Sequence, residues 1–353
     1  MVEKKNFEKI VDGKQTNLYT LNNKNGVKIS VTNFGARVIE LYVPDRNGNY
    51  DDIVLGYDHI DKYLNNTGER FLGAVCGRYA NRIANGTFEI EGKVYHLPIN
   101  NNGQTLHGGI KGLDSVVWDI VSSSNSKILF RYVSPDMEEG FPGTLTITMT
   151  YELNDEDEFR ITYNAATNQA THINLTHHSF FNFHGEGKGH INDHILQINA
   201  DQFIPVDEVS IPLGVYKSVQ NTPMNFLRPN AIGSRLTEPY PQLKLAGGYD
   251  HNWILSETKR ETIELAATVY EPISGRYMEV WTDQPGIQFY GGNFFDGKTA
   301  SKDGRGVYSH QGAFALETQH FPDTPNQKNF PSTLLYPNEE YKHICVYKFS
   351  VKG

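Results

Sequence analysis

Short segments in which apolar and polar residues alternate recur along the whole chain, and this period of two predicts β-strands. Residues 144–151 and 159–163 show it most clearly, and the polar residues 154–157 between them indicate a hairpin turn. Helical periodicity is confined to residues 59–66 and 231–237. Further strands are predicted at 27–31, 37–41, 87–90, 94–97, 174–183, 263–270, 277–282 and 345–349.

Many short strands with few helices predict an all-β fold, either a β-sandwich or a barrel, and the short connections favour antiparallel pairing. The chain has 353 residues, a length that all-β architectures reach as one unit. No linker rich in Pro, Gly or Ser divides it, and no internal repeat is detectable. We therefore expect one domain over residues 1–353.

The charge balance is acidic, with a formal net charge of −9 at pH 7 and no run rich in Lys or Arg. Such a protein is not expected to bind nucleic acid or an anionic membrane. The sequence has no signal-peptide pattern and no apolar run long enough to span a bilayer. Its two cysteines, Cys76 and Cys345, make a disulfide framework unexpected. We expect a cytoplasmic protein, either a monomer or a homodimer.

Residues 292–299 match the phosphate-loop pattern G-x-x-x-x-G-K-[ST]. That loop binds phosphate because it leads into a helix whose first amides face the ligand. Residues 300–306 contain two glycines and do not favour a helix, and no β-α-β pattern surrounds them. We interpret the match as coincidental.

Two adjacent histidines, His177 and His178, lie on the predicted strand 174–183. Because successive strand residues point to opposite faces, only one of the two imidazoles enters a given site. Clustering of histidines in this region raises a metal-site hypothesis, but no cysteine joins them and no HExxH motif occurs, so we expect no metal. The clustered histidines are His172, His177, His178, His184, His190 and His194.

Several polar residues suggest a ligand site when they are taken together. Glu317 follows the apolar segment 313–316, where a carboxylate is unfavourable unless it is paired or used. Taken singly, Arg78 and Arg82 are typical of surface ion pairs, and Gly108-Gly109 is typical of a turn. Together with nearby imidazoles and amides they supply the mixture of groups that binds a neutral, polyhydroxylated ligand.

The chain resembles the galactose mutarotases, or aldose 1-epimerases, through motifs that follow the family's order and cover nearly its whole length. This resemblance implies a large antiparallel β-sandwich of the galactose mutarotase type. It also implies an isomerase of hexose and galactose metabolism that interconverts the α and β anomers of free aldohexoses such as D-galactose and D-glucose. The matching segments are 33–36, 76–83, 106–109, 138–143, 174–182, 248–251, 285–293 and 316–319, with Pro322 and Asp323.

The resemblance also implies a role for each matching residue. Glu317 corresponds to the base that takes the proton from the C1 hydroxyl, and His178 to the acid that protonates the ring oxygen. The family strand usually has Asn before this histidine, where this chain has His177. The change leaves open which imidazole enters the pocket, and we favour His178. The residues expected to hold the sugar hydroxyls are Arg78, Asn81, Arg82, His107, Asp250 and Gln288.

The expected reaction is acid–base ring opening and reclosure, which requires no metal or redox cofactor. Three alternatives remain open from the residues alone. A glycoside hydrolase or lyase would use Glu317 and Asp250 as its two carboxylates. A non-catalytic sugar-binding module would need no acid–base pair. A hexose-6-phosphate epimerase would need additional cations, for which the sequence has no clear cluster.

Overall fold

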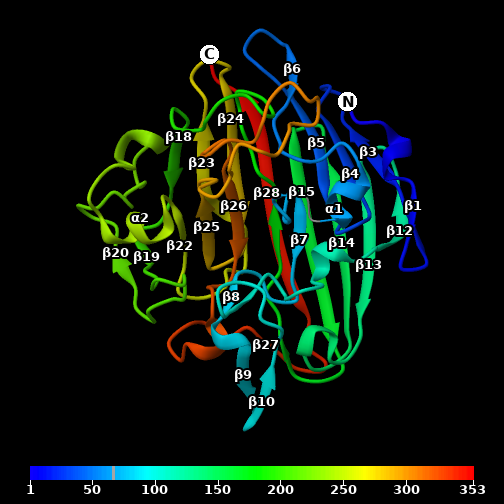
Figure 1. Cartoon of the computed structure of the whole chain (residues 1–353), viewed down its shortest axis with the longest axis vertical. Coiled ribbons are helices and arrows are strands. Elements are labelled where there is room, and N and C mark those ends of the chain that lie inside the picture. The colour runs from blue at the N-terminus through cyan, green and yellow to red at the C-terminus, as the bar shows by residue number, and fades with distance from the viewer. Residues whose placement is uncertain (66–67) are drawn as a thin grey trace.

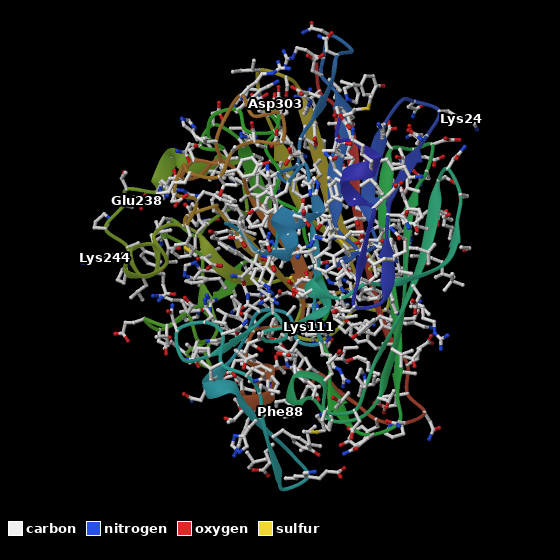
Figure 2. All side chains as sticks on the ribbon, turned by 45° about the vertical axis from the view of Figure 1, so that its right-hand side comes forward. Lys24, Phe88, Lys111, Glu238, Lys244 and Asp303 are labelled. Atoms are coloured by element: carbon white, nitrogen blue, oxygen red, sulfur yellow. The ribbon has the colours of Figure 1, made fainter. Side chains whose placement is uncertain are left out.

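Strands form most of the chain in the computed structural model, which describes residues 1–65 and 68–353. All the hydrogen-bonded pairs between named strands are antiparallel in this described part, as predicted. The strands form two layers, with both termini at the same end of the molecule (Figure 1). Charged side chains such as Lys24, Glu238 and Lys244 project from the edges (Figure 2).

The first layer is a nine-stranded sheet. Its alternating sequence decides which side is buried: in β14 (Leu145–Leu153) every second residue from Leu145 onward is buried, and the residues between are partly exposed. In order across the sheet, its strands are β12 (Asp119–Ser123), β13 (Lys127–Ser134), β14, β15 (Glu158–Thr167), β28 (Tyr341–Val351), β24 (Arg276–Thr282), β23 (Glu264–Tyr270), β18 (Ile195–Ile198) and β21 (Asn230–Ala231).

The second layer consists of three smaller sheets joined edge to edge. Phe181 and Phe314 exchange backbone hydrogen bonds of 2.7 and 2.9 Å and link the two-stranded sheet to the five-stranded one. The Val38 backbone N–H donates to the Gly73 carbonyl oxygen at 2.9 Å, and this bond links the two-stranded sheet to the four-stranded sheet. The strands are β20 (Lys217–Ser218), β19 (Gln202–Ile204), β22 (Asp250–Ile254), β25 (Gly286–Tyr290) and β26 (Ala315–Gln319); β17 (Thr176–His178) and β7 (Ala74–Cys76); and β5 (Val38–Pro44), β4 (Lys28–Thr32), β3 (Leu18–Asn22) and β6 (Tyr50–Asp52).

Short pairs and helices complete the chain. The helices are α1 (Ile60–Leu64) and α2 (Pro241–Ala246), and the remaining strand pairs are β1 (Lys9–Val11) with β2 (Lys14–Thr16), β8 (Arg82–Ile83) with β11 (Thr105–Leu106), β9 (Thr87–Ile90) with β10 (Lys93–His96), and β16 (Thr171–His172) with β27 (Leu334–Leu335). None of the helices in the described chain has the length and apolar character needed to cross a bilayer.

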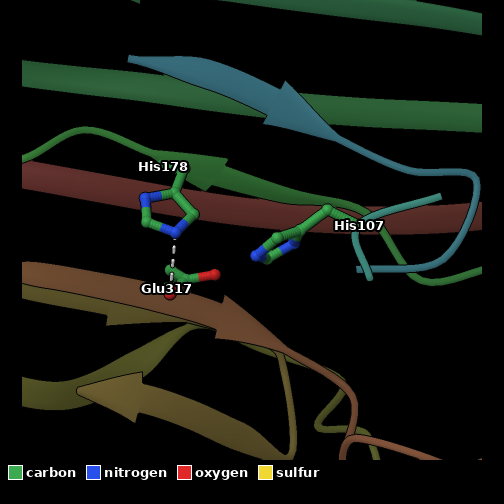
Figure 3. Close-up of side chains that lie close together, drawn as sticks. All are labelled: His107, His178 and Glu317. Carbon is green, nitrogen blue, oxygen red and sulfur yellow. Dashed lines mark ion pairs between the residues drawn. The ribbon is translucent and has the colours of Figure 1, made fainter. Parts of the chain in front are cut away.

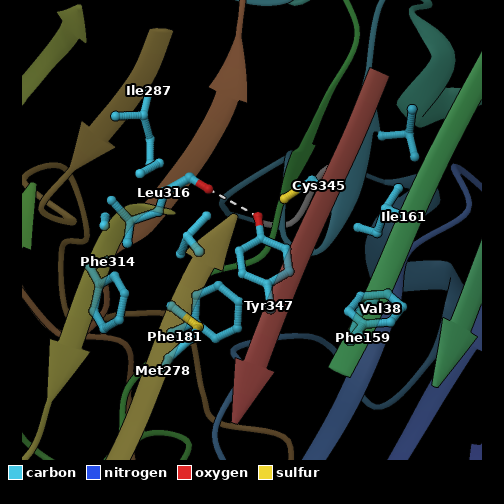
Figure 4. Close-up of a cluster of buried hydrophobic side chains, with 14 of the residues drawn as sticks. Val38, Phe159, Ile161, Phe181, Met278, Ile287, Phe314, Leu316, Cys345 and Tyr347 are labelled. Carbon is cyan, nitrogen blue, oxygen red and sulfur yellow. Dashed lines mark hydrogen bonds between the residues drawn. The ribbon is translucent and has the colours of Figure 1, made fainter. Parts of the chain in front are cut away.

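The space between the layers is filled by apolar and aromatic side chains, with Phe181, Phe314 and Leu316 facing Met278 and Tyr347 (Figure 4). Tyr347 is 1% exposed, and its hydroxyl donates to the Leu316 carbonyl oxygen at 3.0 Å. This bond joins β28 of the first layer directly to β26 of the second. Because both layers share this core, we propose that residues 1–353 form one domain.

The sequence predicted the hairpins β9–β10, β14–β15 and β23–β24, and the structure confirms them. Of the predicted helix 59–66, α1 covers the centre, and residue 66 lies outside the described residues. The predicted helix at 231–237 was wrong, because only a 3₁₀ turn forms there, at Ile232–Arg235. Residues 292–306, which are all described, form no helix, in agreement with rejection of the phosphate loop.

Removing the Tyr347 hydroxyl tests the bond between the layers. We expect Tyr347→Phe to lower the free energy of unfolding by about 1 kcal/mol, the typical net contribution of one buried hydrogen bond. Tyr277→Phe is the control, because Tyr277 lies on the partly exposed face of β24, and we expect a change within about 0.5 kcal/mol. Urea unfolding of both variants gives the comparison; equal losses would contradict the role of this bond.

Candidate active site

A cavity of about 300 Å³ lies on the face of β22 and β26 that is turned away from the first layer. Strand alternation produces this division: on β26, Leu316 enters the core while Glu317 lines the cavity. On β25, Ile287 and Phe289 likewise enter the core. Both faces of these two strands are covered, so all their residues are buried. The strands therefore present polar groups to the cavity from buried positions.

His178 and Glu317 face each other across the floor of this cavity (Figure 3). The distance from His178 Nε2 to Glu317 Oε1 is 3.4 Å, and the two side chains are 6% and 2% exposed. Glu317 Oε2 and His178 Nδ1 have no hydrogen-bond partner among the described residues. Glu317 therefore has one oxygen near the imidazole and a second that is available to a ligand.

His177 points to the other side of β17, into the core between the layers. Its Nδ1 lies 3.2 Å from the hydroxyl oxygen of Tyr151, and its Nε2 lies 2.6 Å from that of Ser179. The aromatic ring of Tyr347 also packs against it. The structure thus answers the question left open by the His-His pair, because only His178 reaches the cavity.

His107 completes the group drawn in Figure 3, with its ring centroid 5.2 Å from that of His178. Its Nδ1 accepts a hydrogen bond from the Asn81 backbone N–H at 3.1 Å. A neutral imidazole carries one hydrogen, so this bond places the hydrogen on Nε2. His107 can therefore donate a hydrogen bond to a ligand hydroxyl or ring oxygen.

Burial changes the proton affinity of these groups in opposite directions. Loss of water raises the pKa of Glu317 well above its usual value, and nearby Asp250 raises this pKa further. Loss of water lowers the pKa of His178 to about 3. It also lowers the pKa of His107 well below its usual value, with a further contribution from His178. The environment thus favours a proton on the carboxyl group over one on the imidazoles.

The other predicted binding residues fall into two groups. Asn81, Arg82 and Asp250 line the cavity. Gln288 contacts it through Asp250, because its side-chain amide donates to Asp250 Oδ1 at 2.7 Å. The prediction for Arg78 needs correction. Its guanidinium is buried and donates to the Ser134 side chain and to the carbonyl oxygens of residues 134, 135, 141 and 142, so it holds that loop and does not line the cavity.

Sequence reasoning missed part of the cavity wall. Most of these residues lie in loops, where no periodic pattern indicates which way a side chain points. For Phe71, the only indication in the sequence is its position shortly before the matching segment 76–83. The missed lining residues are Glu69, Phe71, Asn101, Leu106, Phe180, Tyr290 and Phe294.

Two groups of side chains have atoms close enough to hold a metal: His107, His178 and Glu317, and His184, Asp193 and His194. Their hydrogen bonds argue against this use. His107 carries its hydrogen on Nε2, as argued above. His194 Nε2 accepts from the Phe183 backbone N–H at 2.9 Å, so its Nδ1 carries the hydrogen and donates to Asp193. Neither imidazole presents a free lone pair at its group's centre.

Comparison with known proteins decides the family. The model of the family described as aldose 1-epimerase matches residues 17–348. The chain belongs to the aldose 1-epimerase family. It is 45% identical to a galactose mutarotase from Bos taurus over 325 residues, 92% of each chain. It is 36% identical to an aldose 1-epimerase from Escherichia coli over 340 residues, 96% of each chain.

Solved structures support the same assignment. An aldose epimerase homologue from C. elegans superposes with a TM-score of 0.86 at 29% identity, over 96% of this chain and 100% of the other. A galactose 1-epimerase from Lactobacillus acidophilus gives 0.83 at 27% identity, over 98% and 97%. The predicted mutarotase-type β-sandwich and isomerase function are confirmed, and the hydrolase and sugar-binding-module alternatives are not favoured.

The buried His177 predicts a pH effect on stability. Burial lowers its pKa to about 3, whereas the unfolded value is about 6.5. Between these values the unfolded state binds a proton that the folded state does not, so the free energy of unfolding falls as the pH falls. We expect His177→Asn to remove this dependence, which is at most about 1.4 kcal/mol per pH unit. Urea unfolding of both proteins between about pH 7 and pH 5 measures it; parallel curves would contradict it.

Proposed function

We propose that this enzyme interconverts the α and β anomers of free aldohexoses such as D-galactose and D-glucose, with Glu317 as the base and His178 as the acid. The observation that carries this proposal is the pair itself: a carboxylate and an imidazole 3.4 Å apart, buried in a cavity of about 300 Å³. That volume lies at the small end of ligand pockets and suits a single monosaccharide.

The reaction follows from the two proton transfers that a cyclic hemiacetal needs. Glu317 Oε2 takes the proton from the C1 hydroxyl while His178 gives a proton to the ring oxygen. The bond from C1 to the ring oxygen breaks, and its electron pair goes to that oxygen, which leaves an aldehyde at C1. Rotation about C1–C2 presents the other face of the carbonyl. Reversal of the same transfers closes the ring as the other anomer.

The effect of burial on the pair suits this cycle. With the cyclic sugar bound, the pair acts as carboxylate and imidazolium; after ring opening it is a neutral acid and a neutral imidazole. Burial disfavours the charged arrangement, as the raised pKa of Glu317 and the lowered pKa of His178 indicate. It therefore raises the energy of the charged pair relative to the neutral pair, which favours the two proton transfers of ring opening. One shared proton serves both directions of the reaction.

The remaining groups are proposed to hold the sugar. His107 donates from Nε2, and Asp250 accepts while Gln288 fixes its orientation. Asn81 and Arg82 contribute from the loop beside them. We do not include Arg78 in this set, because its guanidinium is occupied by the 134–142 loop. We further propose a cytoplasmic enzyme that acts as a monomer or a homodimer.

Polarimetry of freshly dissolved α-D-galactose and α-D-glucose tests the assignment. We expect Glu317→Gln and His178→Asn each to slow enzymatic equilibration by about 10²-fold or more, the contribution typical of one acid–base group. Glu238→Gln and His96→Asn are matched controls, because both side chains are exposed and lie outside the cavity. Unchanged rates in the two site variants would contradict the roles of the pair.

A second measurement distinguishes the reaction from hydrolysis. If the wild-type protein released reducing ends from oligosaccharides without accelerating the equilibration of free sugars, the mutarotase proposal would be wrong.

The pH profile of kcat/KM provides a further check on the shared proton. Activity requires one proton on the pair, and a second proton has to charge His178, whose pKa is lowered to about 3. As the pH falls, an imidazole with a lowered pKa stays neutral below its usual value. We therefore expect kcat/KM to be flat between about pH 7 and about pH 5. A tenfold fall per pH unit that begins near the ordinary imidazole value of about 6.5 would contradict this.

A further inference from the structure

The cavity lining includes a carboxylate, Glu69, to which the proposed function gives no role. Glu69 lines its wall, and Glu69 Oε1 accepts a hydrogen bond from the Phe71 backbone N–H at 3.1 Å, which fixes the carboxylate in place. Glu69 also lines an adjoining cavity of about 600 Å³, and both cavities share Phe294. Glu69 therefore lies where a substituent of a bound sugar would extend from one cavity toward the other.

The charges around the cavity do not balance. The pair of His178 and Glu317 shares one proton and carries no net charge. Among the other charged residues that line the cavity, Glu69 and Asp250 face a single cation, Arg82. Arg82 Nε donates to the side chain of Asn101 at 3.3 Å and forms no ion pair within 4.0 Å in the described chain.

Glu69 itself also lacks an ion pair within that distance among the described residues. The neighbouring guanidinium groups of Arg37 and Arg70 are directed to Asp114, at 3.4 and 2.8 Å. Burial and these two arginines act on Glu69 in opposite directions, and burial dominates, so its pKa is raised. Glu69 remains partly exposed, and its carboxylate gains from a ligand that brings a positive charge, because that ligand can donate a charge-assisted hydrogen bond.

We infer that Glu69 gives this enzyme a preference for aldoses that carry an ammonium group, such as 2-amino-2-deoxyhexoses, and makes it reject sugars that carry a phosphate or carboxylate. The inference rests on the proposed mutarotase function and concerns the substrate class of the same site. The Glu69 carboxylate, which has no ion pair within 4.0 Å among the described residues, attracts the ammonium and repels the anions; the cavity of about 300 Å³ has no lysine in its lining, and Lys62 and Lys298 line only the adjoining cavity.

Two amino sugars locate the effect, since the position of the ammonium on the ring decides whether it reaches Glu69. D-galactosamine carries the amine at C2, and 6-amino-6-deoxy-D-galactose carries it at the other end of the ring. Polarimetry at about pH 6 keeps both amines protonated, and D-galactose is the neutral reference. The measured quantity is the ratio of kcat/KM for each amine to kcat/KM for D-galactose.

In the wild type we expect this ratio to exceed one for at least one amine. In Glu69→Gln we expect it to fall about tenfold or more, the contribution of one hydrogen bond to a charged group. Glutamine keeps the shape and the acceptor for the Phe71 N–H. Glu238→Gln removes the same charge at an exposed site that does not line the cavity, and is expected to leave the ratio unchanged. We expect kcat/KM for D-galacturonate to be lower than for D-galactose, and we expect this difference to be smaller in Glu69→Gln.

Three results would overturn the inference: a ratio below one for both amines in the wild type, a ratio that Glu69→Gln leaves unchanged, or equal effects of Glu69→Gln and Glu238→Gln. If Glu69→Gln does not fold, the salt dependence of the wild-type ratio tests the inference. Salt screens the attraction between Glu69 and the ammonium, so the ratio has to fall between about 0.02 and 0.5 M salt; a constant ratio would contradict the inference. Failure of the wild type to equilibrate D-galactose would instead contradict the proposed function, so the two failures are distinguishable.

Discussion

The active site depends on the alternation of side chains along strands whose two faces are both covered. On β26, the Leu316 side chain lies in the core, and the Leu316 carbonyl oxygen accepts a hydrogen bond from the Tyr347 hydroxyl. Because neighbouring strand residues point to opposite faces, Glu317 then lies on the cavity side of β26. A shift of the strand by one residue would bury the carboxylate in the core and expose the leucine. The same alternation separates His178 from His177. Packing between the two layers therefore sets the positions of His178 and Glu317, the proposed acid and base.

The burial that holds this pair also tunes it. Glu317 and His178 lose their water together, and each loss favours the uncharged form. A fully exposed pair would remain ionised near neutral pH, and transfer of its proton through a sugar would be uphill. An isolated buried carboxylate would stay protonated and could not act as a base. With the imidazole 3.4 Å away, we propose that the two groups share a single proton.

The sequence predicted the strands, and the placement of His178 and Glu317 in the cavity, better than the rest of the cavity lining. Period-two patterns identified the hairpin β14–β15, because alternation follows directly from burial on one face. Strands β25 and β26 are buried on both faces, so their pattern alone did not reveal the cavity. Arg78 is close in sequence to the cavity residues Asn81 and Arg82, but its guanidinium donates to the loop that begins at Ser134. Glu69 occurs in a loop, where no local pattern assigns a direction to its side chain.

The residues that line the cavity are held in two ways, some by strands and some by turns. His178 and Glu317 lie on strands, whereas Asn81 and His107 lie where the backbone turns, with φ of 62° and 50°. This left-handed conformation is uncommon for residues other than glycine, and Asn and His are among those that adopt it most often. It is stabilised because His107 N–H donates to the Asn81 carbonyl and Asn81 N–H donates to His107 Nδ1.

Asn81 and His107 are thus held by hydrogen bonds between turns, whereas His178 and Glu317, like Asp250 and Gln288, are held by strands. Glu69 also lies outside the strands, so we propose that its charge affects which sugar binds without moving His178 and Glu317.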